Sequence, residues 1–413
     1  MGQAFTATFT SLASVIASGV LGCSGHGSAP DAGRSDAARH DARVMGDAAG
    51  DAKGDAPDSG RHRSDGGLVS DASIRDADAG STDAPAEAAT PDGCAPGPRG
   101  EPQDLRCTGL YSDWSTKTVS ADVHVYDPGL HLWSDNAQKT RWISLPPGKP
   151  IDTSNMDEWT FPAGTKIWKQ FVLLGKPIET RLLWKMTAAS WYLTTYRWSS
   201  DLTSAPELVT GEADADGQGY EVPGQSKCHS CHDGRLDEVL GFEAVALSSP
   251  AATLAPSSAP PAAVTLAGLA SAGWITSAPD ASLAVPGGPT AAAALGYLHI
   301  NCGTACHNRF AGSAESTGFY MRLDVATLGS VSATDTVTTG VGQVSGFMVP
   351  DAGTSYLLDP HNVGRSAVHY RISVRDGVDG AGNNAQMPPI DTHRVDDAGV
   401  ATVAAWIEAG CGD

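Results

Sequence analysis

Five consecutive residues, Cys228-His229-Ser230-Cys231-His232, carry the most distinctive chemistry in the chain. Two thiols separated by two residues can reach the two vinyl groups on one edge of a porphyrin, and the histidine after the second thiol can turn its imidazole onto the iron. This pattern is the attachment signal of a c-type haem. A thioredoxin-like thiol pair needs a βαβ context, and a structural zinc site needs two further ligands at finger-like spacing. The sequence shows neither, so we predict haem c bound by Cys228, Cys231 and His232.

A second, imperfect copy of the pattern lies at Cys302-Gly303-Thr304-Ala305-Cys306-His307, with three residues between the thiols. The histidine still follows the second cysteine, so the iron ligand stands where it is expected. The extra residue requires a bulge, and Gly303 can adopt the unusual backbone angles that a bulge demands. The alternatives are a local disulfide or two free thiols. We predict a second haem held by Cys302, Cys306 and His307.

A methionine loop, Gln386-Met387-Pro388-Pro389-Ile390, lies eighty residues after His307. In cytochromes with His/Met ligation, a thioether sulfur closes the sixth coordination position of the iron. Neighbouring prolines hold the backbone of such a weak ligand in place. A lone methionine is more often a core residue, but this loop precedes a terminal amphipathic helix in a chain that carries a haem motif. We therefore predict Met387 as the distal ligand of the second haem.

Two helices are predicted around these groups. Pro289 suits the first position of a helix that leads to the second motif. Asp396 suits the N-cap of another helix, and Gly410 suits its end. The apolar face of that helix contains Val400, Val403, Ala404 and Ile407. The C-terminal region therefore reads as helix, haem site, long loops, methionine loop and helix, an order that resembles the class I cytochrome c fold.

The first residues of the chain predict export. Residues 1–23 carry no charge, and their apolar run, Ser11 to Leu21, is too short to span a membrane. The run ends in Val20-Leu21-Gly22-Cys23, which resembles a bacterial lipobox in which Cys23 carries the lipid. The missing basic residues and the bulky Leu21 depart from that pattern, and an ordinary signal peptide with a coincidental cysteine is the alternative. We expect an exported periplasmic, outer-membrane or cell-surface lipoprotein, in keeping with haem attachment outside the bacterial inner membrane.

Residues 24–100 consist mainly of Asp, Ala, Gly, Ser and Arg, with eight Lys or Arg against fourteen Asp or Glu. Such a stretch buries too little apolar surface to offset its ordering entropy, so we predict a disordered tether. Three further cysteines remain outside the haem motifs. In an oxidising compartment Cys94 and Cys107 can close a short loop, or Cys411 can pair with one of them. The sequence does not choose between these pairings.

Residues 101–413 are long enough for two domains and contain 19 Lys or Arg against 33 Asp or Glu. This acidic balance argues against a nucleic-acid partner and permits docking to a basic redox protein. Residues 108–200 hold eight of the ten tryptophans, which we interpret as core, with a sugar-binding face as the alternative. Short aromatic and branched runs there predict an antiparallel, sandwich-like all-β domain. These runs are Thr140 to Leu145, Thr165 to Leu174, Ile178 to Met186 and Ser190 to Trp198.

The predicted fold class is therefore multidomain, with a disordered tether, an antiparallel β domain and a mostly α cytochrome c-like region. The predicted parts are a signal peptide with lipobox at 1–23, the tether at 24–100, the β-rich domain at 101–225, a first haem segment with linker at 226–288 and the cytochrome c-like domain at 289–413. A short helix is expected between Val264 and Trp274.

Several short motifs in a common order resemble a family of exported bacterial two-haem c-type cytochromes with a β-rich N-terminal domain. The resemblance covers about residues 130–410. It is carried by Leu132-Trp133-Ser134-Asp135 with Lys139 and Arg141-Trp142, by Trp159 to Thr165 with Lys169 and Phe171, by Ile178 to Leu183, by Tyr220 to His232, by Tyr297 to Asn308 and by Met387-Pro388-Pro389. The resemblance implies electron transfer and no substrate chemistry. The longer spacing between Cys302 and Cys306 departs from the family pattern.

Three functions compete at this point. The first is a lipid-anchored electron carrier that serves redox protein partners, which we favour over a substrate-converting enzyme. The second is a two-haem peroxidase, which needs an open iron site with acid and base groups that the sequence does not show clearly. The third is a non-redox surface lipoprotein whose β domain binds carbohydrate. The distal ligand of the first haem stays open among Met348, His361 and His369, and Arg371 or Arg375 can pair with a haem propionate or form a solvent-facing salt bridge.

Overall fold

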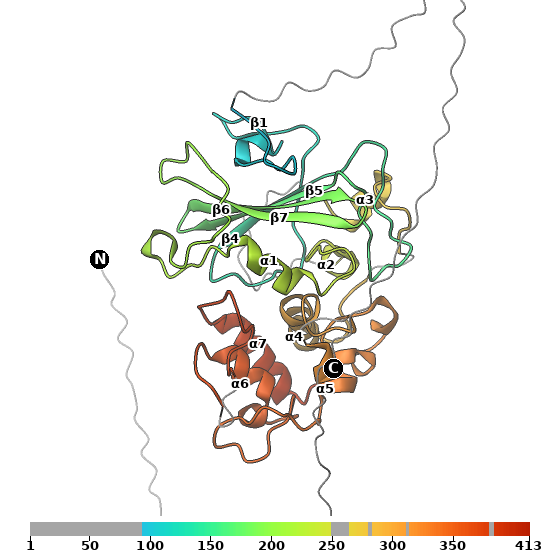
Figure 1. Cartoon of the computed structure of the whole chain (residues 1–413). Coiled ribbons are helices and arrows are strands. Elements are labelled where there is room, and N and C mark those ends of the chain that lie inside the picture. The colour runs from blue at the N-terminus through green and yellow to red at the C-terminus, as the bar shows by residue number, and fades with distance from the viewer. Residues whose placement is uncertain (1–92, 249–263, 280–282, 311–313, 380–383) are drawn as a thin grey trace, which may run out of the picture. The chain divides into compact units, whose positions relative to one another are not determined.

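The computed structural model describes residues 93–248, 264–279, 283–310, 314–379 and 384–413, which belong to one compact unit, residues 83–413 (Figure 1). The predicted signal peptide, the predicted lipid-bearing Cys23 and nearly all of the predicted tether lie outside these residues. The described chain begins with a disulfide between Cys94 and Cys107, while Cys411 is a free, buried thiol. The structure thus selects one of the pairings that the sequence left open.

The described residues contain seven strands in two antiparallel sheets. β1 (Tyr111–Asp113) pairs with β2 (Thr118–Val119), and the larger sheet has the order β3-β4-β5-β6-β7. The five strands of the larger sheet are β3 (His124–Tyr126), β4 (Gln138–Ser144), β5 (Lys166–Leu173), β6 (Lys176–Thr187) and β7 (Ser190–Arg197). Each strand pairs with its neighbour in sequence, and the four predicted β runs are confirmed as β4 to β7.

The two faces of the larger sheet pack against different elements, because side chains alternate along each strand. Trp142, Trp168 and Leu182 on the outer face pack with Leu105 and Leu110 from the segment that leads into β1. The inner face packs against the chain that follows β7 and against α2 and α3, through a cluster that includes Ile143, Ile167, Leu183, Val239, Phe242, Leu247 and Leu269. The segment that contains β1 and β2 therefore covers one face of the sheet, and helices cover the other. The described residues thus form antiparallel sheets as predicted, but not a sandwich of two sheets of similar size.

The helices follow the sheet in sequence, and the last four contribute to a second core cluster, together with Val245 and Ala246 of α2. They are α1 (Gln225–His232), α2 (Ala244–Ser248), α3 (Leu266–Ser271), α4 (Pro289–Leu298), α5 (Asp335–Gly340), α6 (Ala367–Ser373) and α7 (Asp397–Glu408). Leu295 and Leu298 of α4 pack with Val403, Trp406 and Ile407 of α7 in one buried cluster. In Figure 1 these helices lie together on one side of α1 and α2.

The predicted start of α4 and both predicted ends of α7 are confirmed. Pro289 is the first residue of α4, where its missing N–H costs no hydrogen bond. The Asp396 carboxylate accepts a hydrogen bond from the Gly399 backbone at 3.0 Å and caps α7. Gly410 takes a φ of +98° just beyond the end of α7. The expected short helix between Val264 and Trp274 is α3.

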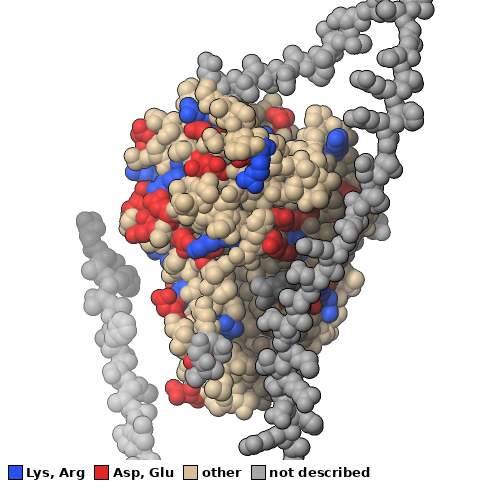
Figure 2. Space-filling model, in the orientation of Figure 1, with Lys and Arg blue, Asp and Glu red and all other residues tan. Residues whose placement is uncertain are grey.

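Most tryptophans of the sheet region are core residues, as expected. Six of them are less than a tenth exposed: Trp133, Trp142, Trp159, Trp168, Trp191 and Trp198. On the face shown in Figure 2, charged side chains gather over the part that carries the sheet and are sparser over the part that carries α4 to α7. Within the described ranges, no helix has the length and apolarity needed to cross a bilayer.

Candidate functional site

The first cysteine–histidine motif lies on α1, which packs against the edge strand β7. The Gln225 side chain donates to the Leu193 backbone carbonyl at 2.9 Å and attaches the start of the helix to that strand. Cys228 and Cys231 are free, half-buried thiols. Burial raises the pKa of the Cys228 thiol and raises that of Cys231 to about 11, so both remain protonated thiols near neutral pH.

The His232 ring is fixed in one tautomer by a backbone carbonyl. Its Nδ1 lies 2.5 Å from the Glu238 carbonyl oxygen, so Nδ1 carries the proton and donates it. Among the described residues, no hydrogen bond involves Nε2 of this ring. Burial, with the nearby positive charge of Lys169, lowers the pKa of His232 to about 3. A neutral imidazole with a free Nε2 lone pair is the form that binds a metal ion.

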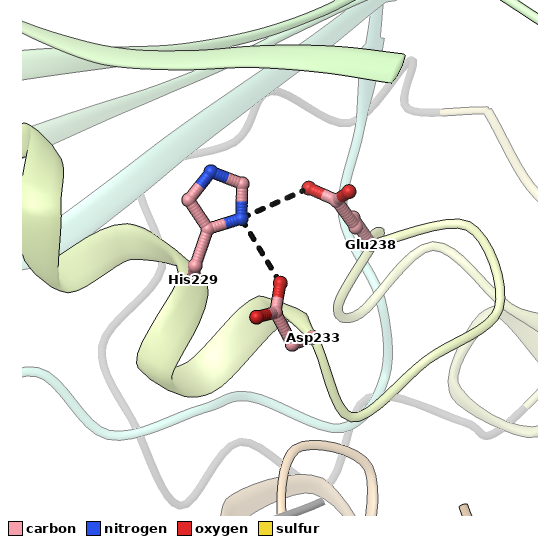
Figure 3. Close-up of side chains that lie close together, drawn as sticks. All are labelled: His229, Asp233 and Glu238. Carbon is pink, nitrogen blue, oxygen red and sulfur yellow. Dashed lines mark hydrogen bonds and ion pairs between the residues drawn. The ribbon is translucent and has the colours of Figure 1, made fainter. Parts of the chain in front are cut away.

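A small charged cluster holds the loop that supplies this carbonyl. Nδ1 of His229 lies 2.9 Å from the Asp233 carboxylate and 3.6 Å from the Glu238 carboxylate (Figure 3). Glu238 has a φ of +51°, which a residue with a side chain adopts at a cost. The three side chains offer ligand atoms within 4.8 Å of one another, the spacing of a small cation site. Glu238 thus contributes its side chain to this cluster and its backbone carbonyl to His232.

The second motif begins within η3, a π-helical turn (His299–Gly303) that contains Cys302 and Gly303. The His307 backbone N–H donates to the Cys302 carbonyl at 2.8 Å. This hydrogen bond joins residues five apart, whereas an α-helical bond joins residues four apart. A π-type turn is a common way to accommodate one extra residue at a functional site. The prediction that Gly303 takes unusual backbone angles is wrong, since its φ is not left-handed. Glycine is required there by space, because a Cβ would lie 2.4 Å from the Arg322 nitrogen.

His307 repeats the arrangement of His232. Its Nδ1 lies 3.0 Å from the Phe319 carbonyl oxygen, and burial lowers the pKa of the ring. Burial also raises the pKa of the adjacent Cys302 thiol to about 12. The thiols of Cys302 and Cys306 are free, so the local disulfide considered above is not formed.

The structure brings the two motifs together. The Asn308 side chain donates to the Gly234 carbonyl at 3.1 Å, just beyond the first motif. The Gly234 backbone also lies so close to Ala305 that a Cβ on Gly234 would stand 1.8 Å from the Ala305 oxygen. The Cys306 thiol is near enough to Cys231 to contribute to the raised pKa of Cys231. Two cysteine–histidine motifs more than seventy residues apart in sequence therefore form one continuous site.

No protein-family model, curated protein or solved structure matches this chain. The interpretation of the site therefore depends on its geometry and on the motifs in the sequence.

Met387 lies in the same region as the second motif. Its side chain packs against the buried cluster that also takes up Cys302 and contains Phe319 and Trp406. Its backbone N–H donates to the Arg371 carbonyl on α6 at 2.9 Å, and the Arg371 charge also acts on His307. The neighbouring Gln386 side chain donates to the Thr392 carbonyl at 2.8 Å and closes the loop.

The candidates for a distal ligand beside the first motif lie elsewhere. Met348 is 54% exposed. His361 contacts the Glu408 carbonyl at the end of α7 at 2.9 Å, and the nearest charge that acts on His369 is also Glu408. The guanidinium groups of Arg371 and Arg375 donate to the backbone carbonyls of Asn384 and Arg394, at 2.8 and 3.1 Å.

Sequence reasoning missed the cations that face the first motif. Arg181 acts on the thiols of Cys228 and Cys231, and Lys169 acts on the His232 ring. Lys169 entered the sequence analysis merely as part of a motif, and Arg181 as part of a strand. The local signal was Lys139 and Arg141 at alternate positions of β4, which places both on one face of that strand. That Lys169 and Arg181 stand on the same face depends on the strand register.

Proposed function

We propose that the chain is an extracytoplasmic c-type cytochrome that transfers electrons through one or two covalently bound haems. The observation that carries this proposal is the arrangement shared by both motifs. In each, a half-buried histidine donates its Nδ1 proton to a backbone carbonyl beside two free cysteines. Histidine ligands of metals are commonly oriented by a second hydrogen bond of this kind.

The residues present fit the groups of a haem. Cys228 and Cys231 would supply two thioether bonds, and His232 the proximal ligand; Cys302, Cys306 and His307 would do the same at the second position, with Met387 as distal ligand. A bound haem supplies a one-electron redox centre. The chain's own contribution is to keep both imidazoles neutral, to aim Nε2 away from competing hydrogen bonds, and to hold the Met387 loop against the helical core.

Export and a lipid anchor at Cys23 belong to the same proposal. The Cys94–Cys107 disulfide supports an oxidising compartment, where such bonds persist. The acidic balance of residues 101–413 supports redox protein partners with basic docking surfaces over nucleic acid.

The test is to produce the full chain in a bacterium with active c-type haem maturation and to record a pyridine haemochrome spectrum and an intact mass. We expect two added haem masses. Cys228→Ser/Cys231→Ser and Cys302→Ser/Cys306→Ser should each remove one haem, whereas Cys411→Ser should retain both. One haem in the wild type would restrict the proposal to the motif whose variant removes it, and a colourless wild-type protein would overturn it.

A further inference from the structure

Three cations stand directly opposite one another across the middle of the larger sheet. The strand register pairs Arg141 of β4 with Lys169 of β5, and Lys169 with Arg181 of β6. Lys139 lies two residues before Arg141, on the same face of β4. Like charges placed directly opposite destabilise a sheet, so the stability of the sheet does not explain this row.

These cations are on the inner face of the sheet, which other parts of the chain cover. Lys139 and Arg141 are each 4% exposed. The Lys169 ammonium group donates to the Leu240 carbonyl at 2.9 Å, and that of Lys139 donates to the Leu132 carbonyl. Carbonyl oxygens satisfy single donors of an ammonium group but do not balance its charge.

The cations outnumber the carboxylates that pair with them. Arg141 pairs with Asp127 at 3.2 Å, and Arg181 pairs with Glu179 at 2.6 Å. Glu179 is fully buried and also accepts hydrogen bonds from Thr195 and Tyr220. Within the part of the chain that the structure describes, no ion pair reaches Lys139 or Lys169. The buried ammonium group of Lys139 and the half-buried one of Lys169 therefore lack a paired carboxylate.

The protonation of these lysines reflects that imbalance. Burial, together with Arg141 and Arg181, lowers the pKa of Lys169 to about 7. Burial and the surrounding cations lower the pKa of Lys139 well below its ordinary value, although Glu179 opposes the shift. An anion placed among these groups would favour both charged forms.

Helix α1, which carries the first motif, lies beside the strands of the larger sheet (Figure 1), and the charges of Lys169 and Arg181 act on its residues Cys228 and His232. A haem attached there brings two propionate carboxylates, the same number of negative charges that the site lacks. We propose that Lys139 and Lys169, with Arg181, form a carboxylate-binding pocket for the propionates of the haem bound at His232. This inference rests on the proposed function, since it requires that haem.

The experiment uses the full chain loaded with haem, in the wild type and in Lys139→Met, Lys169→Met and Lys166→Met. Lys166 is the matched control because it lies on β5 but on the outer face, where its ammonium group donates to the Thr108 carbonyl at 2.8 Å. The readout is the propionate bending band in the resonance Raman spectrum, with haem content measured on each sample. We expect the band to shift in both inner-face variants and to stay in place in Lys166→Met, with unchanged haem content in all three.

Different results contradict the proposed function and the propionate pocket. A wild-type protein without haem overturns the proposed function, whereas loaded inner-face variants with an unchanged propionate band overturn only the pocket. A wild-type band that moves when chloride or phosphate is removed from the buffer assigns the cations to a free anion and also overturns the pocket. If a methionine variant does not accumulate, the wild type decides: its band should differ from that of the haem peptide released by proteolysis, and coincidence of the two contradicts the proposal.

Discussion

In the proposed cytochrome, Met387 is the distal ligand of the second haem and sets its reduction potential. A thioether ligand raises the reduction potential relative to a second imidazole. The structure holds the Met387 backbone to Arg371 and packs its side chain with the cluster that takes up Cys302. We predict that Met387→Ala abolishes the iron–sulfur charge-transfer band and lowers the potential of one centre, as measured by absorption spectroscopy and redox titration.

Met348 provides the control for this prediction. Its side chain is 54% exposed, so Met348→Ala should leave both the band and the potentials as in the wild type. If Met348→Ala removes the band and Met387→Ala does not, the assignment of the distal ligand is wrong.

Asp237 is a second residue with a large expected effect, in this case on stability. Its carboxylate accepts hydrogen bonds from the Trp191 indole at 2.6 Å and the Phe161 backbone at 2.5 Å, and pairs with the buried Lys185. It thereby ties the sheet to the segment that follows the first motif. We predict that Asp237→Ala lowers the free energy of unfolding by about 3–5 kcal/mol, because the Lys185 charge is left buried and unpaired. Chemical denaturation of the full chain measures this change.

The double variant tests the cause of that loss. Lys185→Met removes the stranded charge, so Asp237→Ala/Lys185→Met should be more stable than Asp237→Ala alone. If the two variants are equally unstable, the lost hydrogen bonds and not the unpaired charge explain the effect.

At the scale of the elements, the sequence predicted the strands and helix ends that depend on nearby residues. Short runs of aromatic and branched residues predicted the strands β4 to β7, Pro289 predicted the start of α4, and Asp396 and Gly410 predicted the two ends of α7. These features depend on neighbours within a few residues. The motifs of the candidate site are equally local, which is why Cys228, Cys231 and His232 could be named from the sequence.

Contacts between elements that are far apart in the sequence could not be predicted from such local patterns. Lys139 and Arg141 alternate along β4, which is typical of a solvent-facing side of a sheet, yet both are buried. The carbonyls of Leu132 and Leu240, which lie outside the strands, accept hydrogen bonds from Lys139 and Lys169. The packing of Gly234 on Ala305 likewise depends on two segments far apart in sequence. No property of either segment alone reveals such a contact.

The π-helical turn η3 illustrates the same limit and gives a test. Gly303 was expected to supply unusual backbone angles, but the structure requires its lack of a Cβ beside Arg322. We predict that Gly303→Ala lowers the free energy of unfolding by about 1–3 kcal/mol through overpacking and reduces haem attachment at the second motif. Thermal unfolding and intact mass measure the two effects.

Gly329 serves as the control, because a Cβ there would have no atom within 4 Å. Gly329→Ala should match the wild type in stability and haem content. Equal behaviour of the two alanine variants would contradict the steric account of Gly303.

At the scale of the whole described unit, buried charged side chains connect the sheet region with the segments that follow the two cysteine–histidine motifs. Glu158, which precedes β5, pairs with Arg235 after the first motif at 3.3 Å and with Arg322 after the second motif. Glu243, just before α2, lies 3.1 Å from His299 at the start of η3. Neutralising one partner in such a network leaves the opposite charge buried without compensation. The protonation state of the buried carboxylates should therefore affect the stability of the whole unit.

This junction predicts a specific dependence of stability on pH. Burial alone would raise the pKa of Glu243, but His299, Arg235 and Arg322 outweigh it and lower the pKa to about 2, from an ordinary value of 4.5. Because the folded value is the lower one, ionised Glu243 stabilises the fold above about pH 4.5, and this contribution is lost as the pH falls toward 2. In Glu243→Gln the free energy of unfolding should therefore fall less steeply over this range than in the wild type. Glu408→Gln, at an exposed position of α7, should parallel the wild type. An equally parallel curve for Glu243→Gln would show that the ionised Glu243 carboxylate does not stabilise the fold.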